Sequence, residues 1–212
     1  DLCIDHHGSN SGYADALYLD SSACATAEII YQLICKMGVE IDGVLADCLY
    51  TGISTDTGCF LFGNTSARSH EIAARLMEAG ARVRDLNMIL FETKSRARLA
   101  IESIALSNLE YHFQDRCALI YMTWEQIEST GVETSDLEGL TSLPRQIEGV
   151  QVGITLRQQP SGSYKISVRT QPGVDACAIC TRLGGGGHSM AAGCELVGGL
   201  DNAKQAILAE VE

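Results

Sequence analysis

The chain begins with the segment Leu2-Cys3-Ile4-Asp5-His6-His7, a short apolar run that ends in one carboxylate and two imidazoles. The run predicts the end of a buried strand, with the three polar side chains at its carboxyl end. One hard oxygen and two nitrogen donors suit manganese, zinc, iron or cobalt. Because residue 1 is Asp rather than Met and the strand is already ending, we expect that a further segment precedes this chain. The triplet therefore predicts a metal site that needs additional ligands.

The composition indicates a globular protein. Of 212 residues, 46% are hydrophobic, enough for one large or two modest cores. No apolar run approaches the length of a membrane span, and the start lacks the residue order of a signal peptide. We therefore expect a cytoplasmic protein without a membrane partner.

The charge limits the class of ligand. The formal net charge is −12, from 27 acidic and 15 basic side chains. A charge of this sign repels a long polyanion, so extended duplex DNA is not an expected partner. A small phosphate ester held by a metal and a few arginines remains compatible, because such contacts are short-ranged.

Nine cysteines are scattered among apolar neighbours, which favours reduced core thiols over disulfides. Cys177 and Cys180 have the spacing of a redox or metal pair. They lie within a helical pattern, however, and no second pair at zinc-site spacing accompanies them. We interpret them as core residues.

The first part of the chain has the periodicity of helices. A βα step is followed by an apolar helix at 42–53 and a third helix at 69–79, which ends at Gly80. The segment 83–111 stays helical and is rich in charges, as expected of a connector.

The second part has the alternation of strands. Residues 117–122 predict a buried strand, and 150–156 and 164–169 alternate on either side of a turn, which predicts a hairpin. Helices at 175–183 and 201–211 would complete an α+β or α/β domain.

Asp56 is a second candidate metal ligand, because it follows the apolar helix at 42–53, where a carboxylate would be exposed. The alternative is that Asp56 only caps the following turn.

The run Gly184-Gly-Gly-Gly-His-Ser-Met-Ala-Ala-Gly193 is a candidate anion site. Successive glycines let backbone N–H groups converge on one anion, and we expect His188 and Ser189 to begin a short helix that faces it. The alternative is a flexible hinge. Arg169, with Lys165 and Ser167 at neighbouring positions, could reach the same anion; its alternative is a solvated arginine on an edge strand.

Together, the Asp5-His6-His7 triplet, Ser54-Thr-Asp-Thr-Gly58, Ser167-Val-Arg-Thr170 and the glycine run resemble the DHH/DHHA1 phosphoesterases. The order and spacing are most similar to the small oligoribonuclease and pAp-phosphatase branch. The resemblance implies an α/β protein with three parts: the C-terminal part of a parallel-sheet, helix-rich DHH domain at 1–82, a helical connector at 83–111 and an α/β DHHA1 domain at 112–212.

The resemblance also implies roles for individual residues. His6 and Asp56 would be ligands of two Mn²⁺ ions, Asp5 would fix the imidazole, and His7 would contact the scissile phosphate. Substrate would be bound by Arg169, Gly186, Gly187 and His188. The expected partner is short RNA or a small nucleotide, and a homodimer is compatible with the sequence.

One departure from the family pattern is that its first two motifs, a His-x-x-x-Asp-x-Asp cluster and a further Asp, do not occur here. We therefore expect this polypeptide by itself to be inactive. Three alternatives stay open: a phosphodiesterase for cyclic di-AMP or linear dinucleotides, a non-catalytic nucleotide-binding module, and a family II pyrophosphatase, which shares the triplet but not the glycine run.

Overall fold

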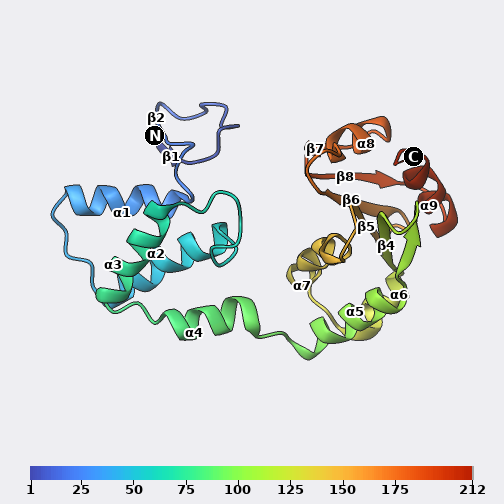
Figure 1. Cartoon of the computed structure of the whole chain (residues 1–212), viewed down its shortest axis with the longest axis horizontal. Coiled ribbons are helices and arrows are strands. Elements are labelled where there is room, and N and C mark those ends of the chain that lie inside the picture. The colour runs from blue at the N-terminus through green and yellow to red at the C-terminus, as the bar shows by residue number, and fades with distance from the viewer. Residues whose placement is uncertain (212) are drawn as a thin grey trace. The chain divides into compact units, whose positions relative to one another are not determined.

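The chain folds as two compact units, Asp1–Thr93 and Lys94–Glu212 (Figure 1). A computed structural model describes residues 1–211, apart from the side chains of Ser135 and Glu138. The division falls inside the segment 83–111, for which the sequence predicts a connector. Among the residues described, no helix has the length and apolar character needed to cross a bilayer.

Unit 1 consists of a pair of short strands and a set of helices. Its elements are β1 (Leu2–Asp5), β2 (Ala16–Leu19), α1 (Thr26–Lys36), α2 (Gly43–Asp56), α3 (Ala67–Glu78), α4 (Val83–Asn87) and the π-helix η1 (Met88–Glu92). The strands pair in parallel, as the predicted fold class requires. The prediction of a buried strand at 2–5 is wrong: Leu2 is 65% exposed and the other three residues are half-buried, because β1 pairs with β2 in a sheet of two described strands.

The core of unit 1 lies between its three long helices. Gly52 of α2 faces α1, and a Cβ atom added at this position would lie 2.7 Å from the Cβ of Ala27. The missing side chain therefore allows the two helices to approach closely. The buried apolar residues are Cys24, Ala25, Ala46, Leu49, Tyr50, Ile53, Ile72, Ala73 and Leu76.

A buried carboxylate links the start of α1 to α3. Glu28 is fully buried, and one of its oxygens accepts a hydrogen bond from the Cys24 amide at 3.1 Å. The other oxygen lies 2.5 Å from Nε of Arg68, which is 45% exposed. Loss of Arg68 would remove the positive charge that pairs with this buried carboxylate.

We expect Arg68→Ala to destabilise unit 1 by about 2–3 kcal/mol, because it leaves the Glu28 charge buried and unpaired. The measurement is the free energy of unfolding from urea denaturation. Arg75→Ala is the matched control, because Arg75 is on the same helix and pairs at 2.9 Å with Glu78, but both side chains are exposed. It should cost less than about 1 kcal/mol. Equal losses for the two variants would contradict the role of the pair.

Unit 2 is a mixed six-stranded sheet with helices on both faces, which confirms the predicted α/β class. The strand order is β3-β4-β5-β6-β8-β7, with β4 and β5 parallel and the other neighbours antiparallel. The strands are β3 (Glu110–His112), β4 (Cys117–Met122), β5 (Val152–Gln158), β6 (Tyr164–Thr170), β7 (Gly186–His188) and β8 (Ala191–Leu196). The hairpin predicted from the alternating segments is the pair β5 and β6.

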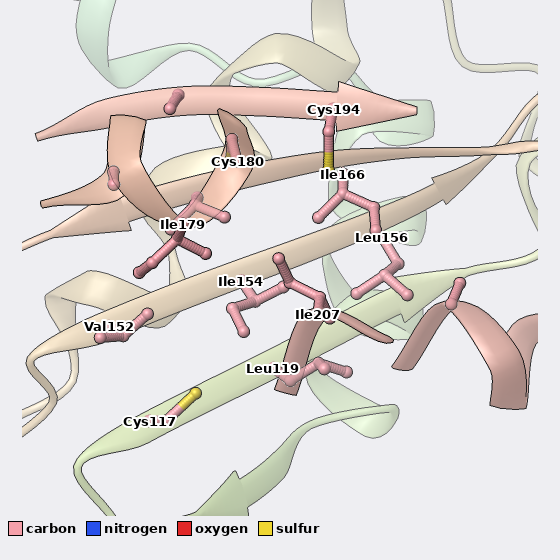
Figure 2. Packing of buried hydrophobic residues seen from close by; sticks show 14 of the residues in the cluster. Cys117, Leu119, Val152, Ile154, Leu156, Ile166, Ile179, Cys180, Cys194 and Ile207 are labelled. Atoms are coloured by element: carbon pink, nitrogen blue, oxygen red, sulfur yellow. The ribbon is translucent and has the colours of Figure 1, made fainter. Parts of the chain in front are cut away.

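The two faces of this sheet have separate cores. On one face, α8 (Ala176–Arg182) and α9 (Leu200–Ala209) pack over the central strands, where Ile154, Leu156 and Ile166 meet Ile179 and Ile207 (Figure 2). The other face is covered in part by α5, α6, α7 and two short 3-10 helices. Their bounds are Arg96–Ser107, Trp124–Thr130, Thr134–Glu138, Gly139–Ser142 (η2) and Pro144–Gln146 (η3).

The cysteines are all free thiols, as expected, although not all are buried. Cys24, Cys117, Cys180 and Cys194 are buried, whereas Cys35 and Cys48 are exposed. Burial raises the pKa of the Cys117 thiol to about 12, so it is uncharged at neutral pH. Cys180 belongs to the core under α8, in agreement with a packing role (Figure 2).

The glycine run is a β-hairpin rather than a loop leading into a helix. Gly186–His188 form β7, which pairs antiparallel with β8. The short helix expected at His188 and Ser189 is therefore wrong. The glycines are needed because the hairpin backbone approaches itself closely: a Cβ at Gly185 would collide with the carbonyl oxygen of Gly193 and lie 2.8 Å from the Cα of Cys194. Gly187 also has a φ of +148°, a backbone conformation that favours glycine.

We expect Gly185→Ala to destabilise unit 2 by about 2–3 kcal/mol, because the new methyl group overlaps backbone atoms that cannot move independently. Gly186→Ala is the matched control, since a Cβ there meets no atom within 4 Å. It should change stability by less than about 1 kcal/mol. Thermal unfolding of both variants provides the measurement, and a smaller loss for Gly185→Ala than for Gly186→Ala would refute the packing argument.

Candidate functional site

His6 and Asp56 face each other in unit 1. The His6 Nε2 atom lies 3.4 Å from Oδ2 of Asp56, and the two side chains are 15% and 45% exposed. The other ring nitrogen, Nδ1, donates a hydrogen bond to the carbonyl oxygen of Ala23 at 3.3 Å. This contact fixes the ring and directs Nε2 toward the carboxylate, an arrangement typical of histidines that bind metals.

Asn64 holds Asp56 near His6. Asp56 is the last residue of α2, and its carbonyl oxygen accepts a hydrogen bond from Nδ2 of Asn64 at 3.1 Å. The same amide donates to the carbonyl oxygen of Cys24 at 2.8 Å. Because Ala23 contacts His6 and Cys24 contacts Asn64, the turn before α1 positions both members of the pair.

The Asp5 carboxylate accepts several hydrogen bonds from nearby side chains and backbone amides. Its oxygens accept from Nδ2 of Asn10 at 2.6 Å, from Nδ1 of His7 at 2.7 Å, and from the backbone amides of His6 and His7 at 2.7 and 3.1 Å. These donors, with Asn10 contributing most, hold the pKa of the Asp5 carboxyl well below its usual range. Asp5 thus fixes the ring of His7, whereas the ring of His6 is fixed by Ala23.

We expect Asn10→Ala to raise the Asp5 pKa, because it removes the donor that contributes most to the stabilisation of the ionised form. The carboxyl carbon signal of Asp5, followed by NMR through an acid titration, gives the midpoint. Since the folded-state pKa is depressed, the ionised carboxylate stabilises this turn above about pH 4, and the stabilisation is lost as the pH falls further. In the variant the loss should begin at a higher pH. An unchanged midpoint would show that Asn10 does not control Asp5.

The donor set of unit 1 fits part of a metal site. One imidazole nitrogen and one carboxylate oxygen lie 3.4 Å apart, and both are donor types that a borderline divalent cation accepts. Among the described residues, no group of three or more His, Cys, Asp or Glu side chains is arranged to hold an ion. The pair can therefore contribute two ligands but does not complete a centre.

A pocket of about 360 Å³ opens on one face of the sheet in unit 2. It brings together two of the predicted substrate-binding residues, Arg169 of β6 and Gly186 of β7. The next two residues of β7, Gly187 and His188, are not among the described residues that line the pocket. The lining residues are Met122, Leu137, Thr141, Thr155, Arg157, Lys165, Ser167, Arg169, Gly186, Ala191, Ala192 and Gly193.

Three cations line this pocket, and none of them pairs with a described carboxylate: Arg157, Lys165 and Arg169. Glu195 is opposite Lys165 in the sheet register, but it accepts a hydrogen bond from the Ser163 hydroxyl at 2.5 Å instead. Burial, and then the neighbouring charge of Arg145, lower the pKa of Arg169. An anion in this pocket would relieve that repulsion.

Arg157 and Thr155 also line the pocket, although no sequence motif marks them as site residues. The signal was present in the alternation of β5, in which Thr155 and Arg157 line the pocket while Val152, Ile154 and Leu156 face the core. The strand register supplied the missing information, because it places Arg157 opposite Lys165 and Thr155 opposite Ser167.

Comparison with known proteins finds a match for most of the second unit. The family model described as the DHHA1 domain matches residues 117–212. The second unit is therefore similar to a DHHA1 domain. The resemblance to the DHH/DHHA1 phosphoesterases, and to their oligoribonuclease and pAp-phosphatase branch, is confirmed by relatives of the whole chain.

Two curated relatives carry the same name. The chain is 37% identical over 210 residues to the bifunctional oligoribonuclease and PAP phosphatase NrnA of Thermus thermophilus, a match that covers 98% of this chain and 62% of the relative. It is 26% identical over 196 residues to NrnA of Bacillus subtilis, covering 91% and 61%. The chain thus spans about three fifths of the length of these relatives.

A solved structure has the same architecture. It is the crystal structure of an exopolyphosphatase-related protein from Bacteroides fragilis, with a TM-score of 0.89 and 28% sequence identity. The match covers 99% of this chain and 62% of that chain.

Proposed function

We propose that this chain is part of a metal-dependent phosphoesterase that hydrolyses short oligoribonucleotides and 3′-phosphoadenosine 5′-phosphate (pAp) to nucleoside monophosphates. The observation that carries the proposal is the DHHA1 pocket, where three cations without described carboxylate partners surround a space of about 360 Å³. The volume suits a single nucleotide. The names of the relatives supply the reaction class.

The pocket explains how an acidic chain can bind an anionic substrate. The net charge of −12 opposes a long polyanion, but the three cations act over a short distance. A small nucleotide meets this local positive field, whereas a long duplex would also be repelled by the net negative charge of the chain. Met122 and Leu137 add an apolar wall against which a base could pack.

In unit 1, His6 and Asp56 are the residues that would hold metal, and Mn²⁺ is the ion that we propose. Two such ions would supply an activated hydroxide and would stabilise the charge that develops on the phosphate. Asp5 accepts from Nδ1 of His7, which leaves Nε2 of that 68% exposed ring for contact with the scissile phosphate. A cytoplasmic location remains a prediction from the sequence.

The chain by itself is proposed to bind nucleotide without hydrolysing it. The specific observation is that the described residues of unit 1 provide two metal donors rather than a full set. The test compares the 212-residue chain with a protein extended to the full length of the relatives, using pAp, oligoribonucleotides of two to five residues, cyclic di-AMP and pyrophosphate with Mn²⁺.

We expect the extended protein to release nucleoside monophosphates from pAp and the short RNAs, and the chain alone to release none. His6→Ala in the extended protein should lower kcat by at least about 100-fold, because it removes a metal ligand. His70→Ala is the control, since its ring only stacks on Phe60 in the same unit. Hydrolysis of pyrophosphate alone, or of cyclic di-AMP alone, would refute the substrate assignment.

A further inference from the structure

A row of small and hydroxyl-bearing residues crosses the floor of the DHHA1 pocket. In the sheet register Thr155 is opposite Ser167, Ser167 is opposite Gly193, and Gly193 is opposite Gly186. All four residues line the pocket. The floor is therefore neutral and polar at its centre.

The cations lie on both sides of this row. Arg157 and Lys165 are opposite each other, two residues along the strands from Thr155 and Ser167. Arg169 is two residues from Ser167 in the other direction. Since alternate residues of a strand are about 6.5–7 Å apart, the pocket has two cationic ends separated by a neutral centre.

Thr155 is a buried polar residue without a partner. It is 3% exposed, and its hydroxyl oxygen makes no hydrogen bond within the described part of the chain. An unmade hydrogen bond at a buried position destabilises a fold, and a valine of the same shape would avoid this loss. Folding therefore gives no reason for the hydroxyl, whereas ligand binding does.

We propose that the Thr155 hydroxyl, with Ser167 beside it, binds the 2′-hydroxyl of a ribose and makes the pocket selective for ribonucleotides. The inference rests on the proposed function. In a nucleotide with phosphates at its 3′ and 5′ positions, the sugar lies between the two anions, as the neutral row lies between the cations. Thr155 lines the same pocket as the long side chains of Arg157, Lys165 and Arg169, which can move without a change in the backbone.

Thr155 is thus a specificity-determining residue. A pocket built to hydrogen-bond a substrate hydroxyl rejects the analogue that lacks it, because the buried group then stays unpaired. Removal of the Thr155 hydroxyl should abolish this discrimination and should not harm the fold.

The test measures the dissociation constants of pAp and its 2′-deoxy analogue by calorimetry, using the 212-residue chain and its Thr155→Val and Thr155→Ser variants. The wild-type chain should prefer pAp by about fivefold to tenfold. Thr155→Val should bind pAp about fivefold to tenfold more weakly and the deoxy analogue unchanged, whereas Thr155→Ser should keep the preference. The thermal midpoint of Thr155→Val should be equal to or higher than that of the wild type, because an unpaired buried hydroxyl is lost.

Two results would overturn the inference while leaving the proposed function in place: equal affinity of the wild-type chain for the two probes, or the same preference in Thr155→Val as in the wild type. A lower thermal midpoint for Thr155→Val would also contradict it, since it would assign the hydroxyl to folding. If the wild-type chain bound neither probe, the proposed site itself would be wrong, and this inference with it.

Discussion

The turn that precedes α1 is the constraint on which the geometry of unit 1 depends. The Ala23 carbonyl fixes the ring of His6, and the Cys24 carbonyl holds Asn64, which in turn holds the end of α2 at Asp56. The Cys24 amide is bound by the buried Glu28. Each of these hydrogen bonds joins a side chain to a backbone atom, so the turn holds the ring of His6 close to the end of α2, where Asp56 lies.

In unit 2 the corresponding constraint is the register of the sheet. One face is closed by α8 and α9 (Figure 2). On the other face, the short helices contact β4, β5 and β6, and the pocket opens beside them, lined by residues of these strands and of the glycine hairpin. Because strand register decides which side chains share a row, a fixed pairing of β5, β6 and β8 produces cationic ends and a hydroxyl floor from residues that are separate in the sequence.

The sequence identified residues with distinctive chemistry more readily than residues whose role depends on pairing. His6, Asp56, Arg169 and Gly186 were predicted from motifs, and the structure brings each pair together within its own unit. Thr155 could not be predicted, because an isolated threonine in an alternating strand has no signal until its cross-strand neighbours are known. A short helix is expected at His188 and Ser189 because glycines before the start of a helix are typical of phosphate-binding loops, whereas here the glycines permit close strand pairing.

The central claim is that unit 2 holds a small nucleotide between the glycine hairpin and the cations of β5 and β6. The most direct measurement is an amide NMR titration of the chain with pAp. The account predicts saturable shifts for Ser167, Gly186 and Gly193, with no comparable change at Gly38 or Gly80 of unit 1. Shifts confined to unit 1, or saturable shifts on the opposite face of the sheet at α8 and α9, would contradict it.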